Sequence, residues 1–194
     1  MMLLRQPSDA VVEAFLRSES RLPFSYAEVG ATGATPPSSG YKVDDYGVTL
    51  GRGEAVYDRA RAAIDAWMVY PSSWFRVYPD GGSPPRPDLV FVTRIHHLGV
   101  WSLNSCRVIE TWDERGLTRA RHGFSFGTLP GHEEQGEERF SLLWDLATDE
   151  VHYKVLAFSR PRGALARLGA PVARLLQARF ARETCAALVA AARV

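Results

Sequence analysis

The sequence is poor in cysteine, in net charge and in long apolar runs. It has two cysteines in 194 residues, Cys106 and Cys185, and they lie far apart. The segment from Met1 to Pro7 turns polar too early for the apolar part of a secretory signal. We therefore expect a cytoplasmic protein with two reduced thiols that pack as small hydrophobic residues. Since no apolar run approaches the roughly 20 residues that a membrane span needs, we expect no integral membrane association.

The charge is nearly balanced, with 23 basic and 22 acidic residues and a net charge of +1. This balance gives no general reason to expect nucleic acid or an anionic membrane as a partner. It is not evenly spread, however, because the segment from Arg160 to Val194 holds seven arginines and one acidic residue, Glu183. We interpret this segment as a solvated helix face, with a docking surface for an acidic partner as the alternative.

Several signatures of catalytic or cofactor chemistry are also missing. There is no phosphate-binding loop and no Cys-x-x-Cys pair, and Gly51-Arg52-Gly53 lacks the third glycine of a dinucleotide fingerprint. Ser125 stands in Phe-Ser-Phe-Gly, which is not the elbow of a serine hydrolase. The turn from His132 to Glu138 is rich in carboxylates, but its spacing fits neither a zinc helix nor a calcium loop. We expect no cofactor and no metal, and interpret this turn as a polar hairpin connection.

The hydrophobic periodicity changes twice along the chain. Residues 9–19 fit a short helix with Val11, Val12, Phe15 and Leu16 on one face, and residues 30–40 have the composition of a loop. A period of two residues then predicts strands at 46–50, 74–78, 89–97, 104–112, 117–128, 137–146 and 151–159. A helical period predicts a helix that opens at Gly51-Arg52-Gly53 and runs through about Met68, with Trp67 and Met68 in its buried stripe and Pro71 as its stop. It also predicts a long helix over about 162–192 that Pro171 kinks or splits.

This order of elements predicts an α+β fold. Short links between consecutive strands favour an antiparallel meander, and a twisted sheet of seven strands needs a cover on its concave face. The last helix is the only predicted element long enough to provide that cover, and a pocket between sheet and helix follows from such packing. We expect residues 41–194 to form one compact unit, preceded by a helix and loop extension over residues 1–40.

Several motifs carry a resemblance to a known family. They are Tyr46–Tyr57, Asn104–Val108, Phe126–His132, Gly136-Glu137-Glu138 and Ala157–Pro161, together with Tyr26-Ala27-Glu28-Val29-Gly30, where alanine replaces a proline. The chain resembles the domain of unknown function family numbered 1990, which is grouped with the START-like clan. The resemblance implies a helix-grip fold, in which a curved antiparallel sheet holds a long C-terminal helix. It implies no activity and no catalytic residue.

Glu138 and Arg107 are the first candidates for a functional site. Glu138 shares the alternation of Phe140, Leu142 and Trp144, so a regular strand aims it at the core, where a carboxylate needs a partner. Arg107 on another strand is the candidate partner, either as a buried clamp or as a polar anchor at the end of the pocket. The alternative is an exposed arginine on the convex face.

Histidines are the other candidates for proton transfer. His122 shares parity with Phe124 and Phe126, so it lines the cavity if that face is concave, and it is the best candidate for a general base. His96 and His97 are adjacent on a strand and point to opposite faces, so only one of them can face a pocket. We expect the ligand-binding set to be Arg107, His122, Phe124, Phe126, Glu138, Phe140, Trp144, Tyr153 and Phe158.

Three functions fit these expectations. The first is a protein that binds a small hydrophobic or aromatic molecule between the sheet and the last helix. The second is a cyclase-like or hydrolase-like enzyme that uses the same cavity, with His122 or Glu138 moving the proton. The third is an interaction module that uses the arginine-rich last helix. The order rests on analogy between folds, and one fold hosts many functions.

Overall fold

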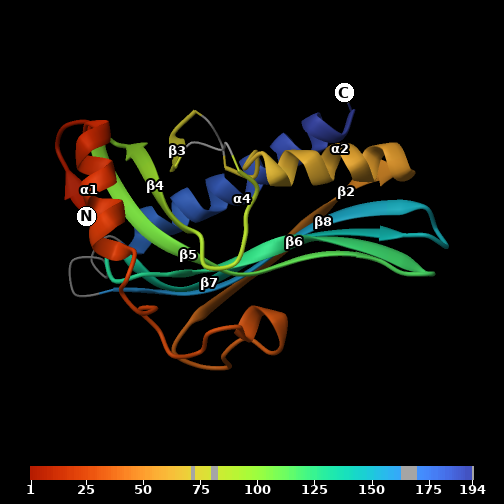
Figure 1. Cartoon of the computed structure of the whole chain (residues 1–194), viewed down its shortest axis with the longest axis horizontal. Coiled ribbons are helices and arrows are strands. Elements are labelled where there is room, and N and C mark those ends of the chain that lie inside the picture. Colours follow the sequence, from red (N-terminus) through yellow and green to blue (C-terminus); the bar gives the residue numbers. More distant parts are fainter. Residues whose placement is uncertain (71–72, 80–82, 163–169, 194) are drawn as a thin grey trace.

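The chain folds into one curved antiparallel sheet with helices on both faces, as seen in a computed structural model (Figure 1). The structure describes residues 1–70, 73–79, 83–162 and 170–193. In chain order the elements are β1 (Met2–Leu3), α1 (Asp9–Glu19), the 3-10 helix η1 (Ala31–Gly33), β2 (Lys42–Arg52), α2 (Glu54–Asp65), β3 (Phe75–Tyr78), β4 (Val90–His97), β5 (Val100–Arg115), β6 (Arg119–Thr128), β7 (Glu134–Asp145), β8 (Glu150–Pro161) and α4 (Ala170–Arg193).

The sheet has the order β2-β8-β7-β6-β5-β4-β3, and every pair of neighbours is antiparallel. This confirms the predicted α+β helix-grip class, because all seven predicted strands are present as a meander that β2 joins at one edge. β1 is an eighth strand that the sequence did not predict, and it pairs with β5 beyond the end of β6. Irregularities in β2 and β5 break the register once each, which is typical of a bent strand.

Two helices cover the concave face. Figure 1 shows α2 and α4 side by side along this face, and α2 buries Tyr57, Ala60, Ala63 and Ile64 in the main core. α2 stops at Asp65, before the predicted end near Met68, and the predicted burial is confirmed at Trp67 but wrong at Met68, which is 47% exposed. The described part of the last helix runs from Ala170 to Arg193, and Pro171 is its second residue. Residues 163–169 of the predicted helix lie outside the described part.

The N-terminal segment covers the convex face. Val12 of α1 is buried with Val92 and Leu103 of β4 and β5, and Phe15 packs against the same cluster. The predicted apolar face of α1 is wrong at Val11, which is 41% exposed. Further along, Tyr26 packs over β6, where a side chain in place of Gly127 would lie 2.2 Å from the tyrosine hydroxyl. Glycine is therefore required at this strand position for the segment to approach the sheet.

Glu137 on β7 fastens this segment to the sheet. Its carboxylate is buried and accepts hydrogen bonds from the hydroxyl of Tyr26 (2.9 Å), from the backbone amides of Gly30 (2.7 Å) and Thr32 (2.9 Å), and from the Thr32 hydroxyl. Beside this carboxylate, burial and the negative charge raise the pKa of Tyr26 well above its ordinary value. A buried carboxylate with several donors stabilises the loop that supplies them.

Replacing Glu137 by alanine should release residues 22–33 from the convex face. The change removes the acceptor of four hydrogen bonds and leaves two backbone amides without their partner, so we expect the free energy of unfolding to fall by about 3 kcal/mol. Urea unfolding measures this loss, and hydrogen exchange should show faster exchange at Gly30 and Thr32.

Glu114→Ala is the matched control, because the Glu114 side chain is 61% exposed and makes only a surface ion pair with Arg121. We expect this control to change the stability by less than about 0.5 kcal/mol. Equal losses in the two variants would contradict the role given to Glu137.

Candidate functional site

A cavity of about 780 Å³ lies between the concave face and α4. Its apolar walls come from the sheet and from the helix: Phe75, Ile95, Val100, Phe126, Leu176 and Phe180 are among the residues that line it. α2 ends at Asp65 and none of its residues lines the cavity, whose wall is formed by the strands, by α4 and by Tyr70 and Trp74.

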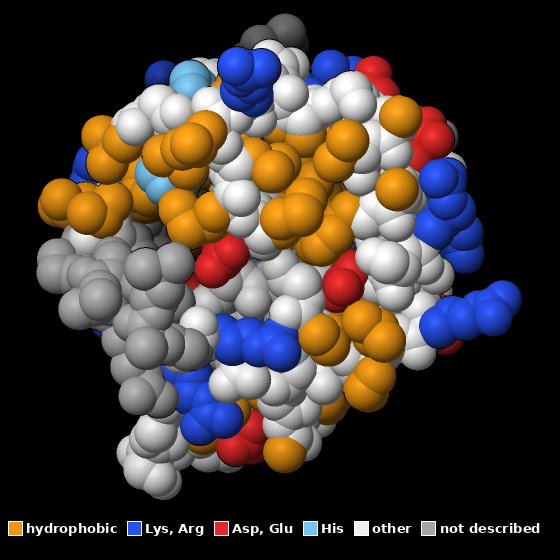
Figure 2. Space-filling model, turned by 90° about the vertical axis from the view of Figure 1, so that its left-hand side faces the viewer, with side chains coloured by type: hydrophobic (Ala, Val, Ile, Leu, Met, Phe, Trp, Pro, Cys, Tyr) orange, Lys and Arg blue, Asp and Glu red, His pale blue; other side chains and the backbone are white. Residues whose placement is uncertain are grey.

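The mouth of the cavity is apolar as well. Met2, Leu98, Val100 and Val172 lie in its wall, and Leu98 and Met2 are 79% and 51% exposed. Figure 2 shows hydrophobic side chains gathered on this end of the molecule, with acidic side chains between them. A ligand therefore meets apolar surface on entering.

The inner end of the cavity is defined by strand register. Phe126, Glu138 and Ala157 are cross-strand neighbours and all line the cavity, whereas the next inward residues of the same strands, Phe124 and Phe140, are fully buried and do not. Glu138 therefore lies at the closed end, and its predicted aim toward the concave face is confirmed. It is half-buried, since part of its surface faces the cavity.

The Glu138 carboxyl has no hydrogen-bond or ion-pair partner in residues 1–70, 73–79, 83–162 and 170–193. Burial, followed by the nearby charges of Glu134 and Asp44, raises its pKa to about 8. Tyr70 in the same wall is 8% exposed, and its hydroxyl also has no partner in the described chain. Burial and the charge of Glu138 hold the pKa of Tyr70 well above its ordinary value.

Between Glu138 and the mouth, the cavity wall carries a second carboxylate and a histidine. Gln177 of α4 donates to both oxygens of Glu134 (2.9 and 3.1 Å), and burial raises the pKa of this carboxyl. His132 accepts a hydrogen bond at Nδ1 from the Glu134 amide (2.9 Å). Burial and the N-terminal ammonium group lower its pKa to about 4, so it is a neutral imidazole with its proton on Nε2.

The basic side chains of the cavity wall are already engaged. Lys42 forms an ion pair with Asp44, and Arg174 of α4 lies 3.7 Å from the other oxygen of the same carboxylate. These two basic side chains therefore share one carboxylate, and neither forms an ion pair with Glu134 or Glu138.

Arg107 does not belong to this site. It lies on the opposite face of β5, where its guanidinium donates to the carbonyl oxygens of Ser20 (3.0 Å) and Leu22 (2.9 Å) and stacks over Phe24. The predicted pair between Arg107 and Glu138 is therefore not formed. The alternation in β5 places Cys106 in the cavity wall and Arg107 on the convex face.

His122 lies on the concave face but outside the cavity. Its Nε2 is 3.0 Å from Asp65 at the end of α2, its Nδ1 is 3.6 Å from Asp113, and its side chain is 9% exposed. Since α2 covers this part of the sheet, His122 joins helix to sheet. Of the two adjacent histidines, His97 lines the cavity, and burial lowers its pKa.

The predicted aromatic residues divide between cavity and core. Phe126 lines the cavity. Phe124, Phe140, Trp144 and Tyr153 lie in the main core cluster, beyond the closed end. Phe158 touches the cavity through its backbone, because its ring packs edge-on against Tyr26 and Tyr41 on the convex face.

Four residues of the polar part of the site were not in the predicted set: Tyr70, His132, Glu134 and Gln177. The alternation of β7 could have indicated Glu134, which has the same parity as Glu138. No local pattern indicates Tyr70 or Gln177, since their places depend on how the chain leaves α2 and on how α4 lies across the sheet.

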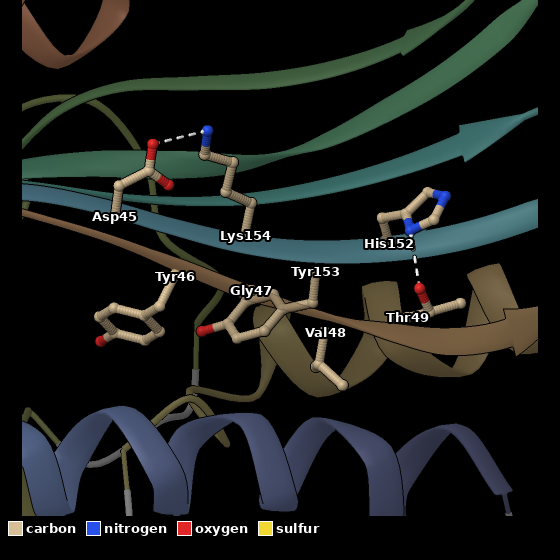
Figure 3. A pocket seen from close by; sticks show the side chains of 8 residues that line it. All are labelled: Asp45, Tyr46, Gly47, Val48, Thr49, His152, Tyr153 and Lys154. Atoms are coloured by element: carbon tan, nitrogen blue, oxygen red, sulfur yellow. Dashed lines mark hydrogen bonds and ion pairs between the residues drawn. The ribbon is translucent and has the colours of Figure 1, made fainter.

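A second, shallow pocket of about 470 Å³ lies over β2 and β8 (Figure 3). Figure 3 shows Tyr46, Val48 and Tyr153 pointing toward α4, while Asp45 and Lys154 (3.0 Å) and Thr49 and His152 (3.1 Å) pair on the other side. The Tyr153 hydroxyl is also bonded, to Thr184 (2.9 Å), and the pocket is wide open, so we take the larger cavity as the candidate site.

Two further observations restrict the chemistry of the described part of the chain. Among these residues no group of three or more histidine, cysteine, aspartate or glutamate side chains is placed to hold a metal ion. No described helix combines the length and the apolar character needed to cross a membrane. Cys106 and Cys185 are both free.

The sequence matches the family model described as Domain of unknown function (DUF1990) over residues 25–187. The chain belongs to this family. It is 36% identical to the UPF0548 protein of Deinococcus radiodurans over 204 residues, which is 99% of each chain. It is 30% identical to the UPF0548 protein of Dictyostelium discoideum over 201 residues, which is 95% of this chain and 93% of that one.

Solved structures show likeness in fold. The hypothetical protein jhp0584 from Helicobacter pylori is similar with a TM-score of 0.50 and 14% identity, over 87% of this chain and 95% of that one. Human STARD10 has a TM-score of 0.47 and 11% identity, over 95% of this chain and 81% of that one. At 14% identity, the likeness to the Helicobacter pylori protein shows a shared fold alone.

Replacing Glu138 by glutamine should change how stability depends on pH. The unfolded chain ionises this carboxyl above its ordinary pKa of 4.5, whereas the folded protein keeps it protonated up to about pH 8. The unfolded state therefore binds fewer protons in this window, so the free energy of unfolding falls as the pH rises from about 4.5 to about 8.

We expect Glu138→Gln to remove this fall and to be more stable than the parent by roughly 2 kcal/mol near pH 8, less than the full shift implies because the carboxyl faces the cavity. Urea unfolding of both proteins across the window measures the difference. Parallel stability curves would show that Glu138 has an ordinary pKa.

Proposed function

We propose that the protein binds a small, mostly apolar molecule in the cavity between the sheet and α4, with a polar group of the ligand at Glu138. The observation that carries this proposal is the cavity of about 780 Å³ with apolar walls and an unpaired carboxyl at its closed end. Ligand sites are typically concave and apolar with few polar groups that fix orientation.

The cavity wall supports this function because large aromatic side chains are only partly used by the core. Tyr46 and Phe75 are half-buried and line the cavity, and Phe126 presents its ring there while it packs on Phe91. Such rings offer broad contact area for aliphatic or aromatic groups.

The raised pKa of Glu138 favours a second candidate, an enzyme that transfers a proton in the same cavity. A carboxyl with a pKa of about 8 can act as an acid or a base near neutral pH, and His132 and Glu134 line the same space. In this candidate function Glu138 transfers the proton, a role for which the sequence analysis had proposed either His122 or Glu138. A bound molecule that changes mass during incubation with the protein would favour this candidate over simple binding.

The interaction module has less support, because several arginines of the segment from Arg160 onward are engaged within the chain. Arg179 pairs with Glu183 and stacks over Trp74, Arg174 pairs with Asp44, and Arg160 stacks over Tyr41. These contacts use the positive charge that a docking surface would offer to an acidic partner.

Filling the cavity tests the binding function. Ala181 of α4 lines the cavity, and phenylalanine at this position would occupy part of the space without removing a core contact. We expect native mass spectrometry of the freshly purified parent to show a bound small molecule, which denaturing mass spectrometry then releases. Ala181→Phe should carry it at an occupancy lower by at least about tenfold.

Ala186→Phe is the matched control, since Ala186 is exposed on the same helix and does not line the cavity. It should keep the occupancy of the parent. Equal occupancy in Ala181→Phe and the parent would place the ligand elsewhere and overturn the proposal.

A further inference from the structure

The cavity is apolar at its mouth and polar at its closed end, and this arrangement restricts the kind of ligand that it can bind. The mouth is lined by Met2, Leu98, Val100 and Val172, whereas the unpaired carboxyl of Glu138 lies at the closed end. A ligand that satisfies both parts must enter with its polar group first and leave its apolar body toward the mouth.

The charges of the wall decide the sign of that polar group. Lys42 and Arg174 both lie against Asp44, and no basic side chain of the described residues forms an ion pair with Glu134 or Glu138. An anionic head group would meet two carboxyls without a basic partner in the described residues. A cationic head group would supply the counter-ion that a buried carboxylate needs.

Aromatic rings surround the same position. Tyr46, Tyr70 and Phe126 all line the cavity, and the charge of Glu138 acts on both tyrosines. The face of an aromatic ring attracts a cation, and this attraction adds to that of the carboxylate where water is excluded. The unpartnered hydroxyl of Tyr70 is a second polar group left unsatisfied close to Glu138.

We propose that the cavity recognises a protonated amine attached to an apolar body, with the ammonium group seated between the Glu138 carboxylate and the rings of Tyr46, Tyr70 and Phe126. This inference rests on the proposed function and names its ligand class. The ammonium nitrogen donates hydrogen bonds to Glu138, and the apolar body lies along Ile95, Leu176 and Phe180.

Binding of the amine is coupled to release of a proton. At about pH 7 the Glu138 carboxyl is protonated in the free protein, and pairing with an ammonium group favours its ionised form. The O–H bond of the carboxyl breaks and the proton passes to the buffer, while the amine keeps its charge. The titratable and charged groups that face or line this end of the cavity are Lys42, Asp44, Tyr46, Tyr70, Cys106, His132, Glu134, Tyr153 and Arg174.

Three compounds with one apolar body test the head group: phenylbutylamine, phenylbutanol and phenylbutyrate. Calorimetry on the full chain at about pH 7 should show the amine binding on the order of tenfold tighter than the alcohol, with the carboxylate weakest, since a charge-assisted contact contributes about that ratio. The heat of amine binding should also vary with the ionisation enthalpy of the buffer, because a proton is released.

In Glu138→Gln, the affinity for the amine should fall to within about threefold of the affinity for the alcohol. The heat of amine binding should no longer depend on the buffer. The control Glu114→Gln removes a carboxylate at an exposed site outside the cavity. It should keep the preference for the amine and the buffer dependence of its binding heat. An amine preference that survives in Glu138→Gln, or a carboxylate that binds as tightly as the amine, overturns the head-group inference.

The same titrations separate the two proposals. If all three compounds bind with similar affinity and Ala181→Phe weakens each of them, the cavity binds apolar molecules and the amine inference alone is wrong. If none binds, or if Ala181→Phe leaves their binding unchanged, the proposed function fails and the head-group inference fails with it.

Discussion

The alternation of side chains along β7 is the constraint on which the rest of the structure depends. Glu137 and Glu138 are neighbours in the chain, and a strand sends neighbours to opposite faces of its sheet. On the convex face Glu137 receives four hydrogen bonds and fastens the N-terminal segment. On the concave face Glu138 has no partner in the described chain. Two adjacent carboxylates thus have opposite consequences, one structural and one available to a ligand.

The cavity follows from unequal cover of the concave face. α2 ends at Asp65, and Trp67 then takes a positive φ of 60°, so the chain turns away and brings Tyr70 over the sheet. Tyr70 packs against Phe91, Phe140 and Phe180 and closes the inner end of the cavity with its ring. On the inner side of Tyr70, α2 and α4 pack on a core that contains Phe124, Phe140 and Tyr153, whereas toward the mouth α4 lines the cavity with Val172 and Leu176.

The sequence was sufficient to predict the strands, the fold class and the orientation of Glu138 toward the concave face. Each of these depends on the local alternation of apolar and polar residues, which can be read directly from the sequence. The partners of Glu137 could not, since they come from residues more than a hundred positions away whose backbone amides carry no sequence signal. The predicted ligand-binding set included Phe124 and Phe140 because of their alternation along the strands. Phe124 and Phe140 are inward but lie beyond its closed end, and that boundary is set by the packing of helices rather than by alternation. Alternation alone left the face of Arg107 open, and the structure shows the convex alternative, since Cys106 takes the concave face.

The unfavourable burial of the Glu138 carboxyl in the free protein supports the interpretation of the cavity as a ligand-binding site. An apolar or amide side chain of similar size would make the free protein more stable, since a carboxyl at the end of an apolar cavity loses hydration without gaining a partner. The fold would also keep its register with such a residue, because the alternation of β7 is fixed by Phe140, Leu142 and Trp144. Glu138 therefore contributes neither stability nor register in the free protein. A group that destabilises the free protein and lies at the end of an open cavity is best explained by what the cavity holds.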